Sequence, residues 1–138
     1  MNKIADVTGS IRGGWAAVRL SPKGMELARR IRLCRGFWSK LLGLMFRFRI
    51  SADEGALLVY AAPSRSMTSI HMFFVPFALG VFWLDENGKV VDAVRALPWR
   101  PFYASAKPAR YVLELHPASL QSLRIGDRVE FYEPQSRT

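Results

Sequence analysis

Residues 81–94 read VFWLDENGKVVDAV, and this stretch predicts a β-hairpin. Two apolar segments flank the polar residues 85–88, and the Asn-Gly pair within them favours a type I′ turn because both central residues need a positive φ. Both faces of the hairpin are largely apolar, so we expect it to lie in the middle of a sheet that is covered on both sides. The register that pairs Glu86 with Lys89 puts one set of side chains on one face (Phe82, Leu84, Val91 and Ala93) and a second set on the other (Val81, Trp83, Val90 and Val94).

The rest of the chain alternates short apolar segments with turns. Strands are predicted at residues 15–20, 27–33, 56–60, 109–115 and 129–132, short helices at 37–46 and 117–124, and an irregular proline-rich loop at 98–108. We expect Gly126 to end the second helix and Asp127 to accept backbone hydrogen bonds in the turn that follows. Many short strands with two small helices indicate a mainly-β protein, a compact single-domain β-sandwich or small barrel. The expected division is an N-terminal extension (1–27, with one strand and a flexible start), a β-rich domain (28–133) and a tail (134–138).

Two of these strands alternate clearly between apolar and polar positions. In residues 27–33, Ile31 and Leu33 share a face opposite Arg30 and Arg32, which predicts a half-buried strand with a basic outer face. In residues 109–115 the same pattern predicts three side chains pointing inward (Tyr111, Leu113 and Leu115) and three pointing outward (Arg110, Val112 and Glu114).

The composition excludes several classes of protein. Half of the 138 residues are apolar, which excludes general disorder, and a single cysteine excludes a disulfide framework. His71 and His116 are the only histidines and have no ligand-like spacing, so no metal and no cofactor is expected. Residues 67–84 are apolar but are divided by a histidine, a proline and a glycine, and the N-terminus lacks the apolar stretch of an export signal. We therefore expect a soluble, cytoplasmic protein.

The positive charge is concentrated in the first third of the chain. Residues 1–50 carry a net charge of +9, which equals the excess of the whole chain. Such asymmetry is typical of a surface for an anionic partner, either nucleic acid or an anionic membrane, although it can also be a solvated basic face. The candidate anion-binding residues are Arg29, Arg30, Arg32, Arg35, Lys40, Arg47 and Arg49.

The proline-rich loop at residues 98–108 contains the strongest candidates for ligand binding. Trp99, Arg100 and Tyr103 lie on it, and aromatic side chains on a stiffened loop can stack on a sugar or a base at a low cost in conformational entropy. His71 and Arg65 are predicted to line the same pocket. The leading hypothesis is a small binding domain, non-catalytic, for a carbohydrate or another polar small molecule. Alternatively, the rings fold back over the core.

Two kinds of reactive site were also considered. A hydrolase could use Ser66 or Ser69 with His71 and an aspartate, Asp85 or Asp92, but no G-x-S-x-G motif surrounds either serine. A hydrolase that uses His71 is therefore the second alternative to a binding domain. Cys34 lies beside arginines that could activate its thiol, although a lone cysteine is more often a packed apolar residue.

Several blocks of the sequence stand out along the chain: GLMFR (43–47), EG (54–55), IHMFFVPF (70–77), FWLDENGKVV (82–91), PARYVLEL (108–115) and IGDRV (125–129). In this order the blocks resemble domain-of-unknown-function family 192. The resemblance covers about residues 28–132 and implies a compact β-rich domain of bacteria and archaea whose biochemical role is not settled. Many members of this family follow an export signal or a lipid anchor.

Overall fold

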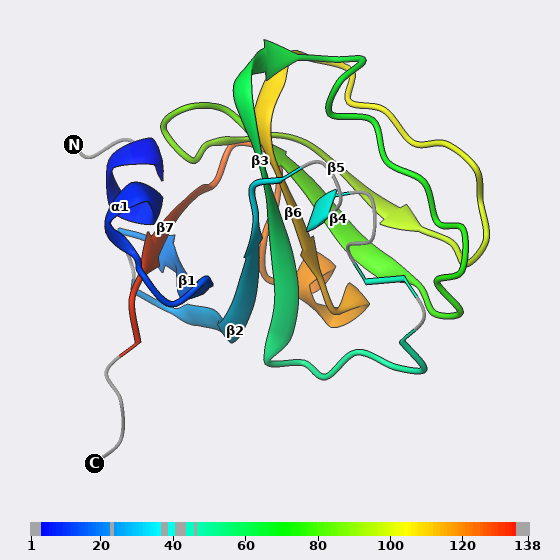
Figure 1. Ribbon diagram of the computed structural model, residues 1–138, viewed down its shortest axis with the longest axis horizontal. Coiled ribbons are helices and arrows are strands. Elements are labelled where there is room, and N and C mark those ends of the chain that lie inside the picture. Colours follow the sequence, from blue (N-terminus) through cyan, green and yellow to red (C-terminus); the bar gives the residue numbers. More distant parts are fainter. Residues whose placement is uncertain (1–3, 23, 37–38, 41–43, 46, 135–138) are drawn as a thin grey trace.

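The computed structural model describes residues 4–22, 24–36, 39–40, 44–45 and 47–134 (Figure 1). The protein is mainly β, as the sequence predicts. Its elements in chain order are α1 (Ile4–Ser10), β1 (Trp15–Ser21), β2 (Glu26–Cys34), β3 (Glu54–Ser64), β4 (Leu79–Leu84), β5 (Val90–Ala96), β6 (Ala109–Leu115), the 3-10 helix η1 (Pro117–Gln121) and β7 (Arg128–Tyr132).

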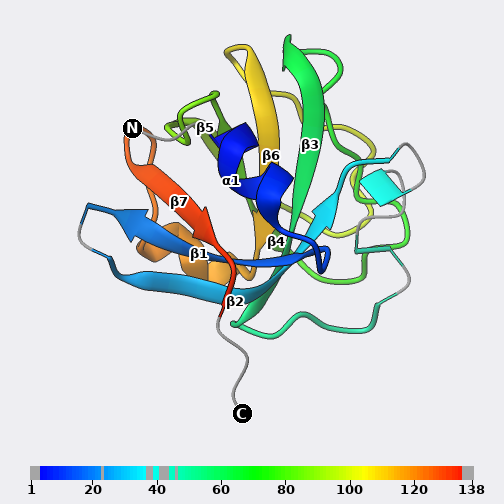
Figure 2. The same ribbon diagram turned by 60° about the vertical axis from the view of Figure 1, so that its left-hand side comes forward.

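The seven strands form one sheet in the order β5-β4-β6-β3-β2-β1-β7. The pairing of β2 with β3 is parallel and the other pairings are antiparallel. The sheet curls so far that its two outermost strands meet at one end, where Lys89 and Arg128 form an isolated bridge (Figure 2). There the Val90 N–H donates to the Asp127 carbonyl at 2.8 Å, and the Val129 N–H donates to the Gly88 carbonyl at 2.9 Å. The architecture is therefore a half-barrel that is closed at one end.

Two apolar cores pack on opposite faces of this sheet. The first core draws residues from all seven strands and from α1, and it fills the space that the curled sheet encloses, with Phe82 and Leu113 at its centre. The second core covers the other face of β3, β4 and β6 and includes Trp83, Met72 and Val75. Strands β4 and β6 are consequently buried along almost their whole length.

The second core overturns one of the expectations from the alternating pattern. Val112 and Glu114 were expected to point outward to solvent, but both are buried. The second core covers that face, and it includes Leu44, Ile50 and Met72 from the connections between strands. Arg110 is half-buried, and its Nε donates to the Tyr60 carbonyl at 3.1 Å. Apolar-polar alternation predicted the strand correctly and its solvent-facing side wrongly.

The hairpin of β4 and β5 is present with a different turn and register. Gly88 has a φ of 84°, whereas Asn87 does not have a positive φ, so the turn is not type I′. The Gly88 N–H donates to the Asp85 carbonyl at 3.1 Å, and the Asp85 carboxylate caps the turn. A bulge shifts the register after Trp83, so that Leu84 pairs with Val90. Val90 and Val91 therefore exchange their predicted faces: Val90 lies in the first core, and Val91 packs against the second. Strand β5 also lies at the end of the strand order, not in the middle of the sheet.

The helices differ more from the prediction than the strands do. Helix α1 lies where a flexible start was predicted, and the second helix is a shorter 3-10 helix that ends at Gln121. The predicted helix at residues 37–46 lies largely outside the described residues. Gly126 has a positive φ of 97°, but the helix ends before it at Gln121, so Gly126 is not the residue that ends the helix. The Asp127 carboxylate accepts from the Arg124 N–H at 2.9 Å, as expected for this turn.

The position of Gly55 leads to a test of the sheet packing. Gly55 pairs with Ile31 on β2 and with Leu115 on β6, and a Cβ there would lie 2.3 Å from the Glu114 carbonyl oxygen. We expect Gly55→Ala to lower the free energy of unfolding by about 1–3 kcal/mol or more, because backbone must move to relieve the overlap. Urea denaturation measures the change. The control is Gly13→Ala, where a Cβ meets nothing within 4 Å, and equal midpoints for the two variants would contradict the packing described.

Candidate functional site

Two loops run side by side at the end of the molecule opposite the chain termini (Figure 1). One loop, residues 65–78, connects β3 to β4, and the other, residues 97–108, connects β5 to β6. They are joined by an isolated bridge in which Ile70 and Tyr103 exchange two backbone hydrogen bonds of 2.8 and 2.9 Å. This pairing fixes each loop against the other.

A second pair of backbone hydrogen bonds lies beyond the bridge. The Met72 N–H donates to the Arg100 carbonyl at 2.8 Å, and the Trp99 N–H donates to the Met72 carbonyl at 3.0 Å. The Met72 side chain is fully buried in the second core. The core therefore holds the backbone of both loops in place through Met72.

Large apolar side chains remain exposed on these loops. Trp99 keeps 53% and Phe102 keeps 64% of its surface accessible, and Phe73 and Phe74 are also exposed. We call these four residues the aromatic surface. Four exposed aromatic side chains on two adjacent loops are unusual on a small domain and are typical of a binding surface.

Phe74 and Trp99 have backbone conformations that large side chains rarely adopt. Their φ angles are 59° and 64°, and among the described residues no other non-glycine residue has a positive φ. Their rings meet edge to face, with centroids 5.3 Å apart. Such conformations cost free energy and persist only where the surrounding structure imposes them, which is a feature of ligand-binding loops.

The five predicted ligand-binding residues all lie on these two loops. Trp99 and Arg100 are exposed, as is Arg65, whose Nε donates to the Ser105 carbonyl across the loops at 3.3 Å. His71 and Tyr103 are half-buried. The structure thus brings the five residues to one end of the molecule, and their role in binding stays a prediction.

His71 and Tyr103 have structural partners. The Nδ1 of His71 accepts from the Phe73 N–H at 3.2 Å, and the two rings lie 5.5 Å apart. The Tyr103 hydroxyl accepts from the Leu97 N–H at 2.8 Å, and its ring packs on the second core. The two alternatives for the aromatic loop therefore both occur, since Tyr103 faces the core and Trp99 faces solvent.

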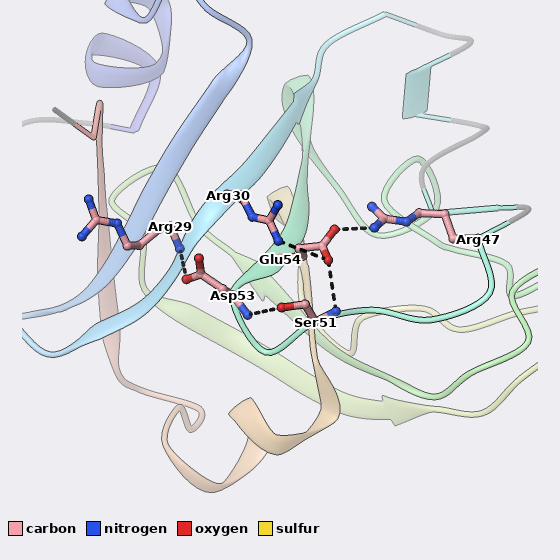
Figure 3. A network of polar contacts seen from close by, with 6 residues as sticks. All are labelled: Arg29, Arg30, Arg47, Ser51, Asp53 and Glu54. Carbon is pink, nitrogen blue, oxygen red and sulfur yellow. Dashed lines mark hydrogen bonds and ion pairs between the residues drawn. The ribbon is translucent and has the colours of Figure 1, made fainter. Parts of the chain in front are cut away.

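The predicted anion-binding arginines lie elsewhere, around the start of β3. Figure 3 shows Glu54 between Arg30, whose guanidinium is 3.5 Å from the carboxylate, and Arg47, which donates a hydrogen bond to it. The Ser51 N–H also donates to this carboxylate. Burial raises the pKa of Glu54, but the hydrogen bond and charge of Arg47 outweigh it, so the pKa is lowered overall.

The remaining members of this predicted site are also largely engaged. Arg29 lies 3.7 Å from Glu26, and the Arg35 guanidinium donates to the Thr8 carbonyl. Arg32 is half-buried, whereas Arg49 is exposed. Most of the predicted anion-binding arginines are therefore engaged in local ion pairs or hydrogen bonds, and anion binding there stays a prediction.

Sequence reasoning missed a buried titratable group, Glu114. The pairing registers place Arg32, Ala56 and Glu114 in one row on β2, β3 and β6. The Glu114 side chain is on the face covered by the second core, and only 7% of the residue is accessible. One signal was available in the sequence: Val112, which shares the predicted outward face with Glu114, is apolar.

Burial controls the ionisation of the groups around Glu114. It raises the pKa of Glu114 to about 7, and the charge of Arg32 opposes this only in part. Burial, and then the charge of Glu114, raise the pKa of Tyr60 to about 12. Burial also raises the pKa of the Cys34 thiol, which favours a packed cysteine over a reactive one.

A search of the described ranges finds no group of three or more His, Cys, Asp or Glu side chains that could hold a metal ion. In the same ranges no helix has both the length and the apolar character needed to cross a membrane.

The fold and the two loops define a class: a small half-barrel domain that carries an aromatic surface at one end. The chain belongs to DUF192, described as an uncharacterized family, whose model matches residues 18–131. A UPF0127 protein of Pyrococcus furiosus is 34% identical over 79% of this chain and 92% of its own length. A UPF0127 protein of Pyrococcus horikoshii is 32% identical over 80% of this chain and 94% of its own.

A solved structure has the same fold. A protein from Sinorhizobium meliloti, solved as a candidate transcription regulator, superposes with a TM-score of 0.75 at 22% identity, over 88% of this chain and 98% of that one. At this identity the likeness shows the fold and does not identify a ligand.

Glu114 leads to a prediction about pH. Because its carboxyl has a pKa of about 7 in the folded protein and near 4.5 when unfolded, the unfolded state loses this proton first as pH rises. Stability from this group is therefore fully present below pH 4.5 and is lost as pH rises to about 7, by about 3 kcal/mol. We expect Glu114→Gln to remove this decline, as measured by urea denaturation at pH 5 and pH 8.

Glu54→Gln is the matched control for this measurement. The pKa of Glu54 is lowered, so its contribution is present at both pH values and is lost only in more acidic solution. Removing it lowers stability without changing the difference between pH 5 and pH 8. If Glu114→Gln retains the decline of the native protein, then Glu114 is not the group responsible.

Proposed function

We propose that this protein is a small binding domain that recognises a carbohydrate or a similar ring-shaped polar molecule on its aromatic surface. The observation that carries the proposal is the pair of exposed aromatic residues, Phe74 and Trp99, held at positive φ on two cross-linked loops. The fold can account for the positive φ angles, but it gives no reason to place two large exposed rings, and not glycine, at these positions. A ligand that stacks on them does.

The chemistry of the loops suits such a ligand. Aromatic rings bind the apolar face of a sugar, and polar groups at their edge set its orientation. The loops provide both, since the exposed Arg100 follows Trp99 directly and the exposed Arg65 lies on the same pair of loops. Because backbone hydrogen bonds already fix Trp99 and Met72, little conformational entropy is lost when the ligand binds.

Replacing the central ring tests the proposal. We expect Trp99→Ala to weaken the binding of an oligosaccharide, identified on an array of neutral and acidic glycans, by about tenfold or more. The control is Trp15→Ala, because Trp15 is exposed to nearly the same extent, 49%, but lies on β1, which is separated from β4 by three strands. Titration calorimetry measures both variants.

The alternative of nucleic-acid binding is tested with the same proteins and with Arg49→Gln. A labelled single-stranded oligonucleotide is titrated at about 50 and 200 mM salt, where phosphate contacts have a strong effect. Oligonucleotide binding that collapses with salt, needs Arg49 and ignores Trp99 would contradict the proposal and assign binding to the basic first third. Equal loss of glycan binding in Trp99→Ala and Trp15→Ala would also contradict it.

A further inference from the structure

We infer that the ligand of the aromatic surface carries a carboxylate, and that its chemical class is an acidic saccharide built from uronic acid units. This inference rests on the proposed function and adds the charge of the ligand to it. It derives from the distribution of charged residues around the two loops.

Both loops lie in stretches of sequence that lack acidic residues. Residues 55–84 and 93–113 contain no aspartate or glutamate, and their charged residues are all cations. Three of these cations lie on the loops themselves and are exposed: Arg65, Arg100 and Lys107. The chain has 11 acidic residues, and none of them lies in these two stretches. Because each stretch contributes one loop to the same end of the molecule, the electrostatic potential at that end is positive.

Of the carboxylates on the strands that the loops connect, one, Asp92, is hydrogen-bonded to a loop, and it faces three exposed loop cations. Asp92 on β5 is the nearest in sequence, and both its oxygens accept hydrogen bonds, from the Ala93 N–H at 2.9 Å and from the Ala106 N–H at 2.7 Å. Glu114 is buried on β6. Glu54 lies at the first residue of β3, whereas residues 65–78 follow the last residue of that strand.

The arginines suit a carboxylate attached to a ring. Arg100 follows Trp99 directly, and its backbone carbonyl accepts from Met72 while its side chain is exposed. Arg65 reaches the second loop, but only its Nε is used there, so the terminal nitrogens can donate to a ligand. A guanidinium binds a carboxylate through two parallel hydrogen bonds, and Trp99 would stack on the ring that bears it.

A pair of ligands that differ only in charge tests the inference. The probes are an oligogalacturonate and its fully methyl-esterified form, which has the same rings without the negative charge. We expect the acid to bind at least about tenfold more tightly than the ester. Arg100→Gln is expected to reduce binding of the acid about tenfold and binding of the ester by a clearly smaller factor, because only the acid offers a carboxylate to the guanidinium and the backbone of Arg100 holds the loops together.

Arg12→Gln is the matched control, because Arg12 is also exposed and lies just beyond α1. Equal losses in Arg12→Gln and Arg100→Gln would overturn the inference, since they would indicate an effect of net charge alone. Equal affinities for acid and ester that both depend on Trp99 would also overturn it and would leave the proposed function intact. Binding of either probe that ignores Trp99 would instead refute the proposed function. Tighter binding of a single-stranded oligonucleotide at Trp99 and Arg100 would reassign the site to nucleic acid.

Discussion

The architecture depends on the burial of strands β4 and β6 on both faces. The curled sheet provides the cover for one face by itself, because residues from all seven strands fill the enclosed space. The other face has no second sheet over it. Connections between the strands must therefore cover it, and this requirement fixes where the loops at residues 65–78 and 97–108 can lie.

Those loops have to be ordered because they form part of a core. Met72 is fully buried and Tyr103 packs on the same core, so each loop has an apolar anchor. Backbone hydrogen bonds between the anchored segments leave the residues between the anchors little freedom. Phe74 and Trp99 are constrained in this way, and their positive φ angles are the local cost of a surface whose shape is set by the core beneath it. The same packing that completes the fold also preorganises the aromatic surface.

The sequence predicted the elements of this fold better than their environment. Strand 109–115 and the hairpin around Gly88 follow from alternation and turn chemistry, which are local properties, and both are present. Which face of a strand meets solvent is set by distant segments, so the burial of Glu114 could not be read from its neighbours. The exchange of Val90 and Val91 between the cores comes from one bulge in the hairpin, beyond which Ala93 and Val94 keep their predicted faces.

The candidate site illustrates the same limit for charge. The sequence located the excess of arginine in the first third of the chain, but proximity in space determines what those arginines do. Arg30 and Arg47 share the carboxylate of Glu54, and Arg35 binds a backbone carbonyl of α1, so much of the excess stabilises the domain itself. The two loops have fewer cations, but no acidic residue lies along them. A few cations that outnumber the nearby carboxylates, placed beside rigid aromatic rings, restrict the chemical class of a ligand more than many arginines that are already paired within the domain.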